Sequence, residues 1–377
     1  MKLSHLSAMT TLCVAAAAQA QAPSPAPAVT IYGLFDAGVE YVSNVGAAGK
    51  GNWRMPANTG TLPSRWGLRG TEPLGDGLAA VFTLEMGFAP GTGALGQGGR
   101  SFGRQAFVGL SSPYGTVTLG RQYTMLFWSL LSADILGPNV YGLGSFDAYI
   151  PNARTDNSLA WRGTFSGLTL GATFSLGRDT VNAGPSPVGT NCPGQNASDR
   201  KACREWSLMA KYDTAQWGVA AAYDRMHGRT LGPAPDAVFG GLNSSDKTDS
   251  RLSLNGYVML GSTKIGGGVI RRDNDGNAAR PKSDLWYLGA AHPVTPALTI
   301  DGALQALRYK DVDDFDSTMV AVRATYSLSK RTALYGQVAH MSNDSSATVS
   351  LSGGAPGSNP APGGSQNGLS VGIRHSF

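Results

Sequence analysis

The sequence predicts an all-β fold, a 16-stranded antiparallel transmembrane β-barrel. Apolar and polar residues alternate along about sixteen segments of the chain. After the N-terminal region, no stretch reaches the roughly 18 consecutive apolar residues that a spanning helix needs. Charged residues make up 15% of the 377 positions, below the roughly 25% typical of soluble domains. A membrane protein with this pattern must cross the bilayer as strands.

The N-terminus has the features of a secretory signal peptide at residues 1–22. Lys2 gives it a positive start, and the run from Met9 to Ala18 is small or apolar. Two A-x-A sites place cleavage after Ala20 or Ala22. The remaining residues, 23–377, are expected to form one barrel domain of an exported protein.

The first strand illustrates the alternation. Val29, Ile31 and Phe35 fall on a face suited to lipid, while Asp36 and Glu40 fall on a face suited to water. The segments begin near Val29, Ser64, Leu78, Phe102, Thr116, Asn157, Leu168, Glu205, Trp217, Arg251, Lys264, Asp284, Leu298, Thr318, Thr332 and Gly368. An even number of strands is expected for single-chain bacterial barrels.

The connections between these segments alternate in length. Short turns, such as residues 327–331, alternate with long loops rich in Gly, Pro, Asn and Asp, such as 177–204 and 342–367. This is the arrangement of outer-membrane barrels. Since an open sheet edge is forbidden in lipid, the last strand, which ends on Phe377, must pair with the strand near Val29.

Two cysteines remain after the signal peptide. Cys192 and Cys203 lie in one polar loop of an exported chain, so a disulfide between them is expected, with two free thiols as the alternative. The five histidines are scattered singly, which argues against a zinc site. We expect no metal and no cofactor.

Enzyme-like patterns occur in unsuitable contexts. Residues 91–96 match G-x-G-x-x-G without a following helix, and residues 368–372 match G-x-S-x-G inside the last predicted strand. Acidic clusters at 273–275 and 311–316 are interpreted as solvated loop acids, with binding of calcium or lipopolysaccharide-bridging cations as the alternative. A catalytic role is not expected.

Four stretches carry a resemblance to a known family. VTIYGLFDAGVEY (29–41), SRWGLRGTEPLGDGLAAVFTLEMGF (64–88), GRQAFVGLSSPYGTVTLGRQY (103–123) and VGIRHSF (371–377) resemble the general porins of beta-proteobacteria. The resemblance implies a homotrimer of barrels in outer-membrane lipid and lipopolysaccharide. Each barrel would hold a water-filled pore for passive diffusion of small ions and solutes, with a preference for anions and no role for nucleic acid. Phe377 resembles the terminal aromatic that the barrel assembly machinery reads.

In this family the third loop folds into the barrel. The matching link, residues 123–154, carries the apolar residues Leu126, Phe127, Trp128, Leu130 and Leu131. Leaving them in water would be costly, so we expect the loop to pack on the inner wall and to constrict the pore.

The resemblance also implies the charges of the constriction. Its basic side would be Arg65 in SRWGLRG, Arg104 in GRQAF and Arg154 before DNSLAW. Alternation places Arg65 and Arg154 on the wet face, but it places Arg104 there only if Phe107 faces lipid. The expected acidic side, opposite the arginines, is Glu85, Asp134 and Asp147.

Three functions follow from these patterns. A passive diffusion channel is the leading hypothesis. The alternatives are a barrel with an adhesive or structural role and, as the weakest, a barrel hydrolase. Ordinary solvated strand charges are the alternative for the constriction residues.

Overall fold

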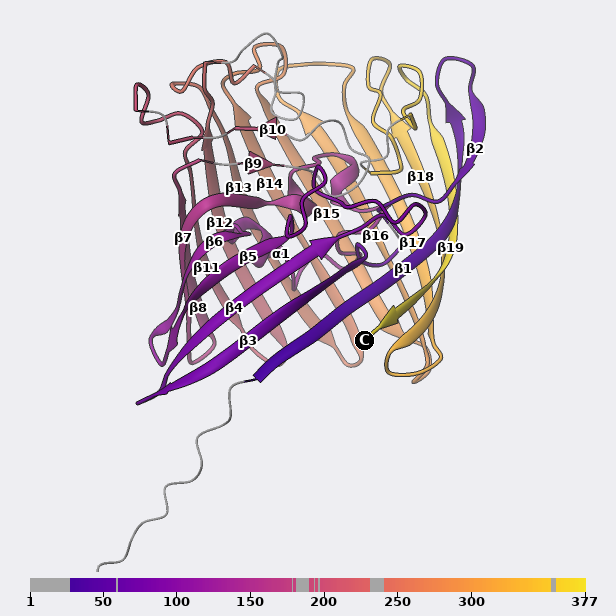
Figure 1. The fold of residues 1–377 in the computed structure, drawn as a ribbon. Coiled ribbons are helices and arrows are strands. Elements are labelled where there is room, and N and C mark those ends of the chain that lie inside the picture. The colour runs from indigo at the N-terminus through magenta and orange to yellow at the C-terminus, as the bar shows by residue number, and fades with distance from the viewer. Residues whose placement is uncertain are drawn as a thin grey trace, which may run out of the picture.

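The protein is described by a computed structural model that covers residues 28–58, 60–177, 179–180, 190–192, 194–195, 197–230, 241–353 and 357–377. The predicted signal peptide, 1–22, lies outside the described residues. Within the described part of the chain, no helix has the length and apolarity to cross a membrane. Figure 1 shows the strands winding around one closed wall, with a segment of the chain folded inside it.

Sixteen strands form the wall. They are β1 (Ala28–Val45), β3 (Arg65–Gly75), β4 (Leu78–Gly87), β5 (Gln105–Ser112), β6 (Gly115–Tyr123), β7 (Arg154–Phe165), β8 (Leu168–Ser175), β11 (Glu205–Asp213), β12 (Trp217–His227), β13 (Thr248–Leu260), β14 (Thr263–Asn274), β15 (Lys282–Pro293), β16 (Leu298–Tyr309), β17 (Ser317–Ser327), β18 (Thr332–Asn343) and β19 (Gln366–Ser376). The strand number predicted from the sequence is confirmed.

Smaller elements lie in the loops. They are β2 (Lys50–Arg54), which pairs with the end of β1, the strand pair β9 (Asp179–Thr180) and β10 (Thr190–Asn191), the helix α1 (Met125–Leu130) and the 3-10 helices η1 (Leu143–Ser145) and η2 (Ile150–Asn152).

Every wall strand is antiparallel to its neighbours, and the wall closes between β1 and β19. The register of that seam runs from Leu34 opposite Ser376 to Val42 opposite Gly368. The other edge of β1 pairs with β3, so β1 has a partner on both sides. The closure predicted for the last strand is therefore confirmed.

The alternation predicted from the sequence separates the two faces of the wall. Ile31 is 66% exposed on the outer face, whereas Asp36 and Glu40 are fully buried on the inner face. Phe377 points outward and is 51% exposed, as its parity predicts. The outer face is thus apolar, and most polar side chains of the wall face the lumen.

The two ends of the barrel differ. Figure 1 shows long loops at one end and short turns at the other, and the C-terminus lies at the short-turn end. In outer-membrane barrels short turns face the periplasm. In the loop between β8 and β11, Cys192 and Cys203 form a disulfide with their Cα atoms 5.4 Å apart.

Candidate pore constriction

The third loop, residues 124–153, leaves β6 and folds into the barrel before it reaches β7. Its helix α1 buries Leu126 and Leu130 against inward side chains of β11 and β12, which include Met209 and Met226. This burial removes apolar surface from the water of the lumen, as the sequence predicts. The expectation is wrong for Leu131, which is 50% exposed because it lies past the end of α1.

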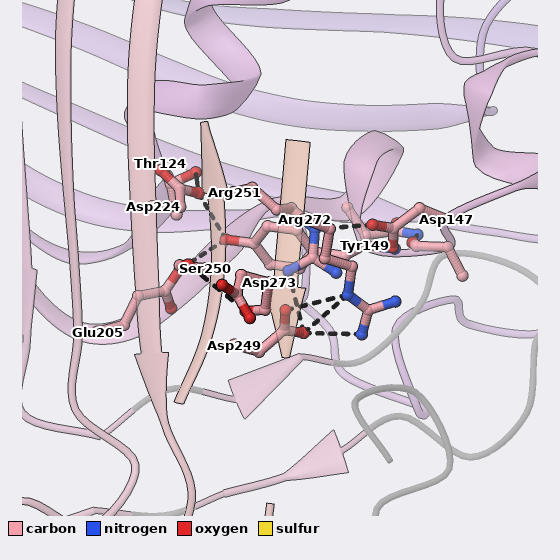
Figure 2. A network of polar contacts seen from close by, with 12 residues as sticks. Thr124, Asp147, Tyr149, Glu205, Asp224, Asp249, Ser250, Arg251, Arg272 and Asp273 are labelled. Atoms are coloured by element: carbon pink, nitrogen blue, oxygen red, sulfur yellow. Dashed lines mark hydrogen bonds and ion pairs between the residues drawn. The ribbon is translucent and has the colours of Figure 1, made fainter. Parts of the chain in front are cut away.

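Ion pairs hold the middle of the loop to the wall (Figure 2). Arg251 of β13 donates from Nε to Asp147 at 2.7 Å and from Nη1 to Asp249 at 3.2 Å. Arg272 of β14 also donates to Asp249, at 2.8 Å. Burial alone would raise the pKa of Asp147, but the guanidinium groups of Arg251 and Arg272 outweigh it and bring the pKa to about 2. Asp147 is thus a charged anchor whose side chain is only 10% exposed.

A second anchor lies beside the first (Figure 2). The Tyr149 hydroxyl lies 2.6 Å from Glu205 Oε1 and 2.8 Å from Asp224 Oδ2. Thr124, at the start of the loop, donates to the same Asp224 oxygen at 2.7 Å. Burial raises the pKa of the Tyr149 phenol well above its ordinary value, so the hydroxyl stays neutral. Both ends of the loop are therefore fixed to β11 and β12.

The predicted arginines gather on the wall where the loop begins. Arg104 donates from Nε to Glu85 and from Nη2 to the Tyr123 hydroxyl, both at 2.7 Å. Arg154 donates to the same hydroxyl at 3.0 Å, and its guanidinium lies 4.7 Å from the centre of the Tyr123 ring. Arg65 Nε lies 3.6 Å from Glu85 Oε2. We call Arg65, Glu85, Arg104, Tyr123 and Arg154 the arginine cluster.

The cluster has an excess of positive charge. It holds three guanidinium groups, and among the described residues Glu85 is the one carboxylate in contact with them. Arg154 is fully buried, whereas the side chain of Arg65 is 23% exposed. Arg65 is therefore the member of the cluster that meets the water of the lumen.

One detail differs from the sequence prediction, and another had been left open by it. Glu85 lies beside the arginines and not opposite them, because its strand β4 is the direct neighbour of β3. Phe107 faces the lumen, since Val108 and Leu110 occupy the lipid face with 58% and 54% exposure. Arg104 nevertheless points inward, because it precedes the first residue of β5 and alternation does not apply to it.

Asp134 lies on the loop side of the lumen. With Leu131, Phe127 and Pro138 it lines a recess of about 160 Å³ that is otherwise largely apolar. The backbone N–H of Gly137 donates to its carboxylate at 3.2 Å. Burial raises the pKa of Asp134 to about 6, against the opposing effects of this hydrogen bond and of Arg323.

Two tyrosines of this region were missed by the sequence prediction. Tyr123 joins Arg104 to Arg154, and the Tyr32 hydroxyl donates to Glu85 at 2.9 Å. The inward parity of Tyr32 was a usable signal. Tyr123 stands at the end of a strand, where only its contacts with the two arginines reveal its role.

Comparison with known proteins identifies the family. A family model described as Gram-negative porin matches residues 6–346. The outer membrane porin protein 32 of Delftia acidovorans is 30% identical over 362 residues, which cover 93% of this chain and 94% of that protein. This chain is a Gram-negative porin.

Further relatives agree with this membership. An outer membrane porin protein of Bordetella pertussis is 29% identical to this porin, over 84% of this chain and 89% of its own. The solved anion-selective porin from Comamonas acidovorans has the same fold, with a TM-score of 0.74, 24% identity and coverage of 93% of this chain and 100% of that chain.

Membership and fold together make the porin an outer-membrane channel for passive diffusion and not an enzyme. The G-x-S-x-G pattern at residues 368–372 lies within β19, where the chain continues straight along the seam. The inserted loop and the arginine cluster lie in the lumen of this channel.

Proposed function

We propose that this porin prefers anions and that its selectivity is set at the arginine cluster. The observation that carries the proposal is the charge of the cluster, in which Glu85 balances only one of Arg65, Arg104 and Arg154. Fixed positive charge beside a narrow aqueous path lowers the energy of a passing anion and raises that of a cation. The anion-selective porin from Comamonas acidovorans, which shares the fold, supports the preference for anions.

The two predicted acids of the third loop add little unpaired negative charge to the constriction in this proposal. Asp147 is paired with Arg251, which neutralises its charge. It therefore anchors the loop and adds little to the electric field across the pore. Asp134 is the acidic residue that borders the recess at the loop. Among the six residues predicted for the constriction, the basic side therefore dominates.

The test is the reversal potential of the purified porin in a planar bilayer under a KCl gradient. Arg65→Gln is expected to move the reversal potential toward cation preference, and Arg65→Gln with Arg154→Gln is expected to move it further. The control is Arg271→Gln with Lys310→Gln, which removes two positive charges that flank Asp284 and leaves the cluster intact. An unchanged reversal potential in the cluster variants would contradict the proposal that the arginine cluster sets the selectivity.

We also propose that the porin works as a homotrimer in contact with lipid and lipopolysaccharide, and that assembly machinery reads Phe377. The exposed apolar outer face, with side chains such as Val219 and Leu288 more than half exposed, offers a surface for lipid and for other copies. A solved outer-membrane protein of Vibrio cholerae with this fold is described as a trimer form. Light scattering of the detergent-solubilised porin measures the stoichiometry.

Cleavage after Ala20 or Ala22 is checked by N-terminal sequencing of the exported protein.

A further inference from the structure

A recess in the lumen wall lies on the short-turn side of α1 and outside most of the arginine cluster. It has a volume of about 340 Å³, near the lower end of the roughly 300–1,000 Å³ typical of small-molecule pockets. Residues of β1 and of β3 to β7 form its wall, and Trp128 of α1 lies on one side of it.

An aromatic side chain stands in the wall of this recess. Phe107 lies between Thr83 of β4 and Gly120 of β6, its cross-strand partners. Gly120 has no side chain to cover the ring, and its φ of +133° favours glycine. Phe107 therefore presents apolar surface to the lumen, where contact with another apolar group is favourable.

Two arginines line the same recess. The guanidinium of Arg162 lies 3.7 Å from the centre of the Trp128 ring, and that of Arg69 lies 5.2 Å from the centre of the Tyr32 ring. Within the part of the chain that the structure describes, neither forms an ion pair with a carboxylate. Among the described residues that line the recess there is no Asp or Glu. It therefore combines an apolar ring, a stacked cation and an excess of positive charge.

We propose that this recess binds small aromatic carboxylates during their passage through the channel. The ring of the ligand lies against Phe107 and Trp128, and its carboxylate lies between Arg162 and Arg69. An inorganic anion or a short aliphatic acid has the charge but no ring for Phe107. A neutral aromatic compound has the ring but nothing for the arginines. The inference rests on the channel function and adds a class of solute to it.

The experiment uses the intact porin in planar bilayers with KCl on both sides and three probes added at the short-turn side. Benzoate carries ring and charge, acetate carries charge alone, and benzamide carries the ring alone. Benzoate is expected to reduce the KCl current at a concentration about tenfold lower than either of the other two, because it uses both kinds of contact.

Two variants separate these contacts. In Phe107→Ser, benzoate is expected to block the KCl current only at the concentration that acetate needs. In Arg162→Gln, benzoate is expected to block only at the concentration that benzamide needs. Val108→Ala is the matched control, because Val108 is the next residue of β5 and its side chain lies on the lipid face. Benzoate should block this variant at the same concentration as the original protein. Phe107→Leu keeps an apolar group and replaces Phe107→Ser should that variant fail to fold. In Phe107→Leu, the blocking concentration of benzoate should lie between its value in the original protein and that of acetate.

The outcomes are distinct. If benzoate and acetate block at the same concentration in a porin that conducts KCl, the proposal that the recess binds aromatic rings is overturned. Loss of block in Arg162→Gln with full block in Phe107→Ser would also overturn it, because the site would then recognise charge alone. Absence of stepwise KCl channels would instead contradict the channel function itself.

Discussion

The backbone of Phe377 exchanges two hydrogen bonds with Gly33, each 3.0 Å from nitrogen to oxygen. A Cβ added at Gly33 would lie 2.3 Å from Cζ of the Phe377 ring, closer than real Cβ atoms approach a neighbour. Gly33 therefore leaves the space in which the terminal ring lies over the seam between β1 and β19. The last residue of the chain completes the ladder and also covers a glycine of the first strand.

Gly33→Ala should weaken the seam, because the Phe377 ring must move to admit the new methyl group. The expected loss in the free energy of unfolding is about 1 kcal/mol, the low end of the range for overpacking, because the Phe377 ring is half exposed and can move. Urea unfolding of the folded porin in lipid vesicles measures it. Gly336→Ala is the control, since the nearest heavy atom to its new Cβ is Val371 Cγ1 at 3.9 Å. Equal losses for the two variants would show that the ring does not depend on Gly33.

Tyr123→Phe should destabilise the arginine cluster. The Tyr123 hydroxyl accepts hydrogen bonds from Arg104 and Arg154, and its removal leaves two buried N–H groups without that partner. The expected cost is about 1–3 kcal/mol in the free energy of unfolding. Tyr114→Phe is the control, because Tyr114 is 79% exposed in a short turn. A Tyr123→Phe porin as stable as its control would mean that water replaces the hydroxyl at no cost.

The ion preference should depend on pH through Asp134. Its pKa of about 6 means that the carboxylate is charged above pH 6 and neutral below it. Lowering the pH from about 7.5 to about 5 removes this negative charge from the recess and should increase the preference for anions. Asp147, with a pKa of about 2, stays charged throughout this range.

Reversal potentials measured across this pH range test the assignment. Asp134→Asn should give the low-pH value at every pH, and Asp76→Asn, in the short turn between β3 and β4, should behave like the original porin. A pH dependence that survives in Asp134→Asn would assign the titration to another group.

The sequence predicted the wall well, because lipid on one side and water on the other impose a period of two on every strand. It failed where a residue faces neither lipid nor open water. Phe107 faces a lumen that α1 partly fills, so its apolar character did not indicate its side. Arg104 lies before a strand, where parity carries no information.

The contacts of the third loop could not be predicted for a different reason. Asp147 of the inserted loop meets Arg251 of β13 across 104 positions of sequence, and β13 is not a neighbour of β6 or β7 in the wall. Strand order fixes which residues pair along the sheet, but it does not fix where an inserted loop touches the wall. The resemblance to porins predicted that the third loop folds into the barrel. The residues that anchor the loop are seen only in the structure.

Asp147→Asn tests whether these anchors hold the loop still. The substitution removes the charge that faces Arg251, and Arg251 keeps Asp249 as a partner, so the barrel should still fold. The loop should move more, and the open-channel current noise should rise while the strands stay intact. A double-mutant cycle with Arg251→Gln should give a coupling of about 0.5–3 kcal/mol in the free energy of unfolding, as expected for residues in direct contact. Asp273→Asn is the control, because its side chain is 47% exposed and lies 3.7 Å from Lys282. Unchanged noise in Asp147→Asn, with a coupling near zero, would assign the hold on the loop to Tyr149 and the apolar face of α1.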